Sequence, residues 1–417
     1  MSAPSRIALG LVDRGYASAV AARGVRATFM EGVTMAEYTI SSQYGSLFGM
    51  DVHARSTTVR GFDFATGETK VKRFGDCPAP AEIAAWMKGG FAGPHYAAYE
   101  SGCTGFHMCR ELRGMGIDCD VVAVSTIARS TDDRKRKNDR RDAKRLLAEL
   151  LSPDSSYSTV WVPDEECEGE RDLVRARHDA RQALKRSRQQ ANAILLRHGL
   201  VWNEKAPSGR VKTTWARDHV NWVESQSLPA ASQEALQHYL DAIAEQQALA
   251  RKLDALVREH AGLPRWKPAV DALSHVKGID VPSAFLLAVE FGDFSRFESG
   301  RAVSCWAGLV PSSCDSADKH ANGHITKTGN PYVRGALIEG LSNMHVRKAD
   351  AKKLRKGQEV SGPVRRLCRR CDARMAERHE RMSKEGKQPN VIKIALANEM
   401  VRWVWAIGRA VARERAV

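Results

Sequence analysis

The sequence predicts an α/β domain at the front of the chain, a long helical arm behind it, and a mainly helical C-terminal domain. Short apolar or alternating segments between Leu47 and Val124 have the two-residue period of strands. Glu165–Arg197 and Glu234–His260 are long, charged and helical in pattern. Since the chain has 417 residues, it is long enough for two or three domains.

The front domain, residues 45–155, begins with three expected strands. Leu47–Val52 is apolar, whereas Thr57–Asp63 and Thr69–Phe74 alternate polar and apolar residues around Ala-Thr-Gly, which is typical of a hairpin. The elements expected after them are a helix, a strand, a helix, a strand and a helix, over Ala81–Lys88, Tyr96–Tyr99, Thr104–Met115, Cys119–Val124 and Asp139–Leu151. The order β-β-β-α-β-α-β-α is that of an RNase-H-like layered domain.

The arm is expected over residues 160–265, with Asn203–Ser227, rich in Trp and basic residues, as its bend. Its second long segment has apolar residues close to a heptad repeat, which favours a coiled coil or a helical hairpin. These residues are Leu236, Tyr239, Leu240, Ile243, Leu249, Leu253, Leu256 and Val257.

The two ends of the chain differ in character. The C-terminal domain is expected over residues 270–347, followed by a basic tail and a C-terminal helix over residues 348–417. Residues 1–44 match nothing that follows, so we expect a disordered extension, with Met1 or Met35 as the true start.

Charge and cysteine usage limit the classes of function. The formal net charge of +15 favours a polyanionic partner, either nucleic acid or an anionic membrane surface. No apolar run approaches the roughly 20 residues that cross a bilayer. Cys368 and Cys371 form a lone C-x-x-C, short of the about four ligands of a zinc site. Free thiols and no secretory signal predict a cytoplasmic protein.

Four acids form the first candidate site. Asp51 ends one expected strand and Glu100 ends another, while Asp139 and Asp142 lie three residues apart at the start of a helix. Residues at this spacing share one side of a helix, and the layered topology brings all three places to one sheet edge. Such a cluster could hold two Mg²⁺ ions about 3.5–4 Å apart, with Mn²⁺ as the alternative, and act on a phosphodiester. Alternatively, the aspartates are solvated acids at a helix N-terminus.

These acids stand in recognisable segments. They are G-M-D-x-H at Asp51, Y-E-S-x-x-x-G at Glu100 and K-N-D-x-x-D-A-x-x-L over Lys137–Leu146. Together they resemble the DEDD, RuvC-like N-terminal domain of IS110-family transposases. The resemblance implies that Asp51, Glu100, Asp139 and Asp142 are catalytic metal ligands.

Ala307–Arg334 forms the second candidate site. Its glycines at 323 and 329 would suit a backbone close to a phosphate, and serines 312, 313 and 316 offer nucleophiles. The segment resembles the C-terminal transposase domain of the same family, in its A-G-L-x-P and G-x-I-T-K-x-G-N-x-x-x-R blocks. That resemblance selects Ser316 as the nucleophile, with Ser313 second. Ala317 follows Ser316 where the family has glycine, which is a poor fit to a turn with positive φ.

Ser274–Glu290 precedes that site and has the pattern of a helix, a glycine turn and a second helix. Such a turn either presents backbone N–H groups to phosphates or is a plain hairpin in which Gly278 ends the first helix. The sequence leaves both open. With the N-V-I-K-I-A-L-A-N-E block near the C-terminus, the family resemblance extends over most of residues 45–410.

The resemblance implies a DNA transposase of an insertion sequence, which cuts and rejoins strands through Ser316 with help from the Mg²⁺-bound acids. It also implies a structured guide RNA, a homo-oligomer (dimer or tetramer) and a nucleoid-associated place in the bacterial cytoplasm. The expected nucleic-acid contacts are Arg140, Arg141, Lys144, Lys327 and Arg334. The basic segment Arg347–Lys387 would hold nucleic acid through backbone phosphates.

Two rival functions remain at this stage. One is a RuvC-like nuclease of the Holliday-junction type, which would use the four acids and water and would not need Ser316. The other is a nucleic-acid-binding protein without catalytic activity.

Overall fold

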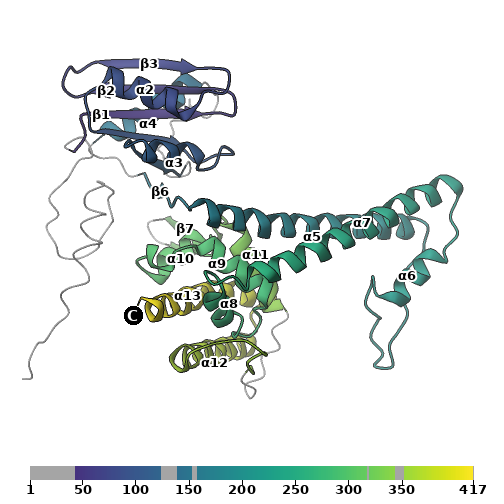
Figure 1. Cartoon of the computed structure of the whole chain (residues 1–417). Helices are drawn as coiled ribbons and strands as arrows, with labels where there is room; N and C mark the ends of the chain where they lie inside the picture. The colour runs from purple at the N-terminus through teal and green to yellow at the C-terminus, as the bar shows by residue number, and fades with distance from the viewer. Residues whose placement is uncertain (1–42, 124–138, 153–156, 317–318, 343–351, 417) are drawn as a thin grey trace, which may run out of the picture. The chain divides into compact units, whose positions relative to one another are not determined.

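The computed structural model describes residues 43–123, 139–152, 157–316, 319–342 and 352–416 (Figure 1). The chain divides into two units, residues 1–163 and 164–417. Most of the expected N-terminal extension, residues 1–42, lies outside the described part.

The first unit is built on a mixed sheet of six strands in the order β3-β2-β1-β4-β5-β6. Strand β1 is parallel to β4, and β4 is parallel to β5, whereas the other pairs are antiparallel. The strands are β1 (Ser46–Val52), β2 (Thr57–Asp63), β3 (Thr69–Phe74), β4 (His95–Glu100), β5 (Asp118–Val122) and β6 (Thr159–Val160). The expected hairpin and buried strands are confirmed, and β6 is an addition.

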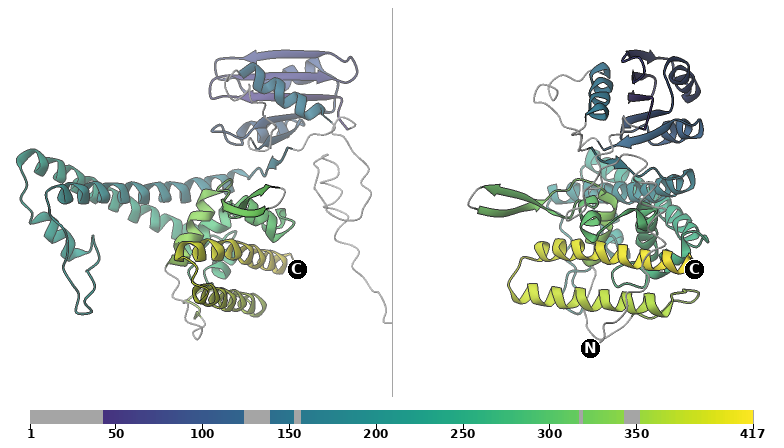
Figure 2. Two further views of the ribbon diagram at one scale, coloured as in Figure 1. Left: turned by 180° about the vertical axis from the view of Figure 1, so that it is seen from behind. Right: turned by 90° about the vertical axis from the view of Figure 1, so that its left-hand side faces the viewer.

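Helices cover both faces of this sheet, as the right-hand view of Figure 2 shows. Alternate strand residues such as Phe48 and Tyr99 pack into the core beneath α2 (Pro80–Gly90) and α3 (His107–Gly114). Residues at the alternate positions, such as Leu47 and Tyr96, face the other way, toward Leu146 and Leu147 of α4 (Asp139–Leu151). The prediction of an α/β N-terminal domain is therefore confirmed, and its RuvC-like character stays a prediction.

Glycine at position 49 lets α4 lie directly on β1. A Cβ atom at Gly49 would be 2.5 Å from the carbonyl oxygen of Ala143 and 2.6 Å from the backbone nitrogen of Leu147. Backbone atoms cannot swing aside as a flexible side chain can. The absence of a side chain at Gly49 thus sets how closely the helix approaches the sheet.

The second unit begins with the arm. Helices α5 (Glu165–Arg197) and α7 (Ala230–His260) run antiparallel and side by side (Figure 1). Along α7 the buried residues recur every seven positions, at Leu236, Ile243, Ala250 and Val257. The helical hairpin is therefore confirmed, and a coiled-coil supertwist stays a prediction. The expected bend also contains a short helix, α6 (Arg217–Glu224).

The rest of the second unit is mainly helical, with one β-hairpin. Its elements are α8 (Lys267–Leu273), α9 (Val281–Phe291), the 3₁₀ turn Phe294–Arg296, α10 (Gly300–Trp306), β7 (Pro311–Ser316), β8 (Lys319–Ile325), α11 (Pro331–Ser342), α12 (Gly362–Lys384) and α13 (Pro389–Arg415). Helix α13 packs against α8, α10, α11 and α12, and buries a stripe that includes Leu396, Val401 and Ile407.

The C-terminal residues are therefore part of this domain. We expected a basic tail and a C-terminal helix over residues 348–417. The helix is present as α13, and the expected tail contains α12, which packs against α13 within the C-terminal core. No helix in the described residues is long and apolar enough to cross a membrane.

The contact at Gly49 gives a stability prediction. Gly49→Ala should lower the free energy of unfolding by about 1–3 kcal/mol, because the new Cβ forces the backbone of α4 away from β1. Calorimetry of the full chain measures this as a lower midpoint of the first unit's transition. Gly89→Ala in α2 is the control, since no described heavy atom lies within 4 Å of its added Cβ. Equal midpoints for the two variants would refute the close-approach argument.

Candidate functional site

The carboxylate edge, which we define as Asp51, Glu100 and Asp142, is set up by strand register. Parallel strands β1 and β4 pair Met50 with Tyr99, so Asp51 and Glu100 follow at neighbouring positions where both strands end. Because side chains alternate along a strand, both acids belong to the sheet face that α4 covers. Both are half-buried. The sequence prediction of a shared sheet edge is confirmed for these two residues.

Asp142 joins the edge through Arg145, one turn further along α4. The Arg145 guanidinium donates a hydrogen bond to Glu100 and lies 3.4 Å from the Asp142 carboxylate. The three side chains are only 17–26% exposed. On the β1 side, Nε2 of His53 lies 3.1 Å from Oδ2 of Asp51. Arg145 therefore balances negative charge that would otherwise separate α4 from the strand ends.

The donor chemistry of this edge fits a hard divalent cation. Mg²⁺ prefers carboxylate oxygens together with water and substrate phosphates. Within the described side chains, however, no group of three or more His, Cys, Asp or Glu is arranged to hold a metal ion. The side chain of Asp139, the first residue of α4, lies outside that part. The four-carboxylate metal site therefore stays a prediction, with three of its members described.

Helix α4 also carries the expected nucleic-acid contacts of the first unit. Lys144 is exposed. The side chains of Arg140 and Arg141 lie outside the described residues.

The expected serine segment is a β-hairpin, which we call the serine hairpin. Strands β7 and β8 pair antiparallel, and Ser316 with Lys319 is the last pair before the turn. The turn residues 317 and 318, and the side chains of Ser313 and Ser316, lie outside the described part, so the expectation about Ala317 falls there too. The backbone nevertheless puts Ser316 at the far end of the hairpin.

Another serine of this segment has a structural role. Oγ of Ser312 donates to the carbonyl oxygen of His324 at 2.9 Å and ties the two strands together. A Cβ at Gly323 would be 2.4 Å from that Oγ. Glycine at 323 thus leaves room for this strand contact, and its approach to a phosphate stays a prediction.

The base of the serine hairpin is a tight corner against α10. Gly308 and Gly329 have φ of 65° and 97°, and a Cβ at Gly329 would be 2.0 Å from the carbonyl oxygen of Trp306. Nη1 of Arg334 donates to the carbonyl oxygen of Ala307 at 2.9 Å. Half-buried Arg334 therefore holds the corner, whereas the expected contact Lys327 is exposed.

A buried carboxylate lies beneath this corner. Glu290 is 1% exposed and accepts two hydrogen bonds from Arg175 of α5, at 2.8 and 3.0 Å. It also accepts one from Nδ2 of Asn330 at 2.7 Å. Oδ1 of Asn330 in turn accepts the first backbone N–H groups of α11, from Tyr332 and Val333. This Glu290 cluster links the arm to the corner that carries the serine hairpin.

Sequence reasoning did not identify Glu290 or Asn330 as site residues. A signal was available, because Glu290 is the one charged residue in the apolar helix α9, Val281–Phe291. A charge in such a helix needs a buried partner. The partner Arg175 is 115 positions away, so no local pattern could identify it.

The glycine turn between α8 and α9 is occupied by contacts within the unit. The N–H of Lys277 donates to Asp372 at 3.0 Å, and Lys352 donates to the carbonyl oxygens of Val276 and Ile279. Gly278, with φ of 80°, packs on the backbone of α11. These contacts favour the plain-hairpin alternative over a phosphate-facing turn.

The C-x-x-C thiols face the interior. Cys371 lies 3.6 Å from the sulfur of Met400, and Cys368 lies close to the carbonyl oxygen of Ala272. Burial raises the pKa of Cys368 to about 12. Both thiols belong to the packing of α12.

Comparison with known proteins identifies the family. Residues 270–356, which include the glycine turn and the serine hairpin, match the family model described as Transposase IS116/IS110/IS902 family. A putative transposase, y4qE, from Sinorhizobium fredii is 35% identical over 75% of this chain and 75% of its own length. The chain belongs to the IS110 family of transposases.

Other members are similar over different extents of this transposase. A probable family 20 transposase of Pseudomonas aeruginosa is 26% identical over 75% of this chain and 84% of its own. The transposase of insertion sequence element IS1533 from Leptospira borgpetersenii is 29% identical over 50% of this chain and 58% of its own. The protein is thus an enzyme of DNA transposition, as the sequence predicted.

The Glu290 cluster gives the second prediction. Glu290→Ala should lower the free energy of unfolding by about 1–3 kcal/mol, because Asn330 and the half-buried Arg175 lose the carboxylate that accepts their hydrogen bonds. Chemical denaturation followed by circular dichroism measures the loss. Glu298→Ala is the matched control, since Glu298 is an exposed glutamate in the connection between α9 and α10. If the two variants were equally stable, the cluster would not hold the corner.

Proposed function

We propose that this transposase cuts and rejoins DNA through Ser316, with help from divalent cations held at the carboxylate edge. The observation that carries the proposal is the parallel register of β1 and β4, which aligns Asp51 and Glu100 at neighbouring strand ends. Helix α4 adds Asp142 to the same edge and begins at Asp139.

In this proposal Asp51, Glu100, Asp139 and Asp142 hold two Mg²⁺ ions, with Mn²⁺ as the alternative. Bound there, the cations would supply Lewis-acid stabilisation of charge on a phosphodiester. The acids themselves fix where that phosphate lies. Lys144, Arg140 and Arg141 on the same helix would contact the neighbouring phosphates of the strand.

Ser316 supplies the nucleophile of the proposed reaction. Its Oγ attacks phosphorus, a bond from phosphorus to the serine oxygen forms, and the bond to the 3′ oxygen breaks. The serine proton ends on that oxygen, which leaves as a 3′-hydroxyl. Attack of another 3′-hydroxyl on the phosphoserine reverses the step and joins new strands. The phosphodiester energy is retained throughout, so no nucleotide triphosphate is needed.

The proposal extends to partners. A structured guide RNA would choose the DNA sites by base pairing, and the protein would hold backbones through its basic residues. The carboxylate edge and Ser316 belong to different units of the chain. In the proposal they act on one phosphodiester within a homo-oligomer, which is a dimer or a tetramer. The protein would work at the nucleoid in the cytoplasm.

A second candidate is a structure-selective nuclease that uses water. The observation in its favour is that the carboxylate edge lies wholly in the first unit, without Ser316. In that case the acids alone would cut, and Ser316 would be dispensable.

A covalent-adduct experiment separates the two candidates. The protein, with its cognate RNA, Mg²⁺ and supercoiled DNA, is quenched in denaturant, and the attached residue is mapped by mass spectrometry. Wild type should carry a nucleotide on Ser316. Ser316→Ala should lose the adduct and lower the rate of cutting at least 1,000-fold, roughly the loss on removing a nucleophile.

Ser312→Ala is the matched control, since this serine ties the strands of the same hairpin. It should retain the adduct. Cutting by Ser316→Ala at the wild-type rate would reject the serine mechanism in favour of the water-using nuclease.

A binding prediction tests the cation site without activity. Arg145→Gln should tighten Mn²⁺ binding by about fivefold, because the guanidinium competes with the ion for the oxygens of Glu100 and Asp142. Electron paramagnetic resonance of free Mn²⁺ gives the affinity. Lys144→Gln removes one positive charge from an exposed neighbour on α4 and should change the Mn²⁺ affinity less than twofold. If both variants bind Mn²⁺ alike, Arg145 does not share the site.

A further inference from the structure

Helix α12 carries an arginine stripe, defined as Arg366, Arg370, Arg374 and Arg378. These residues recur every four positions, so they stay near one side of the helix at intervals of about 6 Å. Arg366 and Arg370 are exposed. Both views of Figure 2 show α12 lying alongside α13.

A groove of about 440 Å³ lies between this stripe and α13. It is lined by Arg374, Arg378, Glu399, Arg402, Trp403 and Ala406. The guanidinium of Arg370 is 6.0 Å from the centre of the half-buried Trp403 ring. The groove thus places an aromatic face beside a row of cations.

The charge of the groove is positive. Glu399 is the one acid among its lining residues, and it accepts hydrogen bonds from Arg374 at 2.8 Å and from Arg378. Three arginines therefore line the groove against one acid, and Arg374 also lies 3.2 Å from Glu377. Arg366 and Arg370 continue the row of cations beyond the groove. Arg365 and Arg369 of the same helix end, with Lys352 and Arg355 that precede the helix, add further cations nearby: after burial, they lower the pKa of His275.

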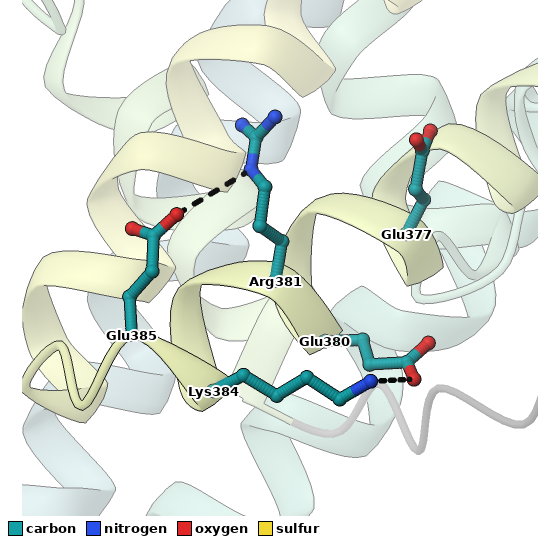
Figure 3. Close-up of a pocket in the computed structure, with 5 residues that line it drawn as sticks. All are labelled: Glu377, Glu380, Arg381, Lys384 and Glu385. Atoms are coloured by element: carbon teal, nitrogen blue, oxygen red, sulfur yellow. Dashed lines mark ion pairs between the residues drawn. The ribbon is translucent and has the colours of Figure 1, made fainter.

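The other end of α12 is different. Figure 3 shows that its side chains pair with one another: Lys384 lies 3.0 Å from Glu380, and Arg381 lies 3.8 Å from Glu385. With Glu377, this end has three acids and two bases. The cationic surface therefore ends within α12, and the paired end offers a control on the same helix.

We propose that the α12–α13 groove binds single-stranded nucleic acid, with phosphates on the arginine stripe and a base stacked on Trp403. Cationic grooves with an aromatic platform bind single strands because every unpaired base has a face to stack. In a duplex the bases are stacked on each other, so a ring within a groove is out of their reach. RNA and DNA strands share this chemistry. The inference rests on the proposed handling of nucleic-acid strands, and not on Ser316 or the cation site.

The arginine stripe is tested by fluorescence anisotropy of the full chain in EDTA. The probes are an unstructured 12-nucleotide RNA, the DNA of the same sequence and its duplex. The double variant Arg366→Gln/Arg370→Gln should weaken single-strand binding by at least about tenfold. It should also reduce the salt slope of log K by about 1.4, since each lost phosphate contact removes roughly 0.7. The control Arg381→Gln/Lys384→Gln should change affinity less than about twofold, because these side chains are paired with acids.

Trp403 tests the stacking half of the proposal. Trp403→Leu should weaken single-strand binding about tenfold, the effect of one stacked base, and leave duplex binding unchanged. Trp403→Tyr should retain most of the affinity, because it keeps an aromatic face. If the two variants have equal melting temperatures, a difference between their single-strand affinities comes from stacking and not from lost stability.

Each outcome decides the proposal. It is overturned if the control double variant weakens binding as much as the stripe variant, if Trp403→Leu binds single strands as wild type does, or if the stripe variant loses only duplex binding. The RNA and DNA probes show which strand the groove prefers. A Ser316 adduct without any groove effect rejects this inference alone, whereas a groove effect without an adduct rejects the serine mechanism alone.

Discussion

The first unit depends on holding like charges together at one edge of its sheet. The register of β1 and β4 puts Asp51 and Glu100 at neighbouring strand ends, and the close contact at Gly49 brings α4 and Asp142 to the same face. Carboxylates that lie close together repel one another unless a cation lies between them. Arg145 provides one such cation in the fold. A divalent ion at the same oxygens would meet the same electrostatic need and add chemistry on a phosphate.

Several parts of this arrangement were predictable from sequence. The apolar runs Leu47–Val52 and Tyr96–Tyr99 predicted the two strands that carry Asp51 and Glu100 at their ends. The pattern over Asp139–Leu151 predicted the helix with its bounds. These segments are predictable because one period of apolar residues dominates each of them. The pairing of Arg145 was not, since it stands in a long basic segment where no neighbour distinguishes it.

The C-terminal half shows where sequence reasoning fails. Polar strands such as Pro311–Ser316 lack the β-branched and aromatic residues that usually indicate a strand, so the serine hairpin was missed. Arginines around α12 suggested a tail, because its buried stripe consists of only a few small or flexible side chains. That stripe is Val364, Cys368, Cys371 and Met375. Such a stripe can be recognised only when the apolar face of α13 is known to lie against it.

Arginine has two uses in the second unit, which is why net charge alone could not locate the nucleic-acid surfaces. Arg175 and Arg334 donate to buried acceptors and fix the corner beneath the serine hairpin. Arg366 and Arg370, in contrast, are exposed, and Arg370 lies over the ring of Trp403. The same residue type thus supports the hairpin and, in the groove that we propose, offers an outer surface to a nucleic-acid strand.

The carboxylate edge and Ser316 are proposed to act on one phosphorus atom. Electron–nuclear double resonance on the Mn²⁺-loaded protein, stopped at its DNA adduct with the cognate RNA, measures this directly. If both groups act on that atom, we expect a ³¹P hyperfine coupling to Mn²⁺ from the serine-bound phosphate, absent in Ser316→Ala and in Asp51→Asn. An adduct on Ser316 whose phosphorus shows no coupling to the bound ion would contradict it.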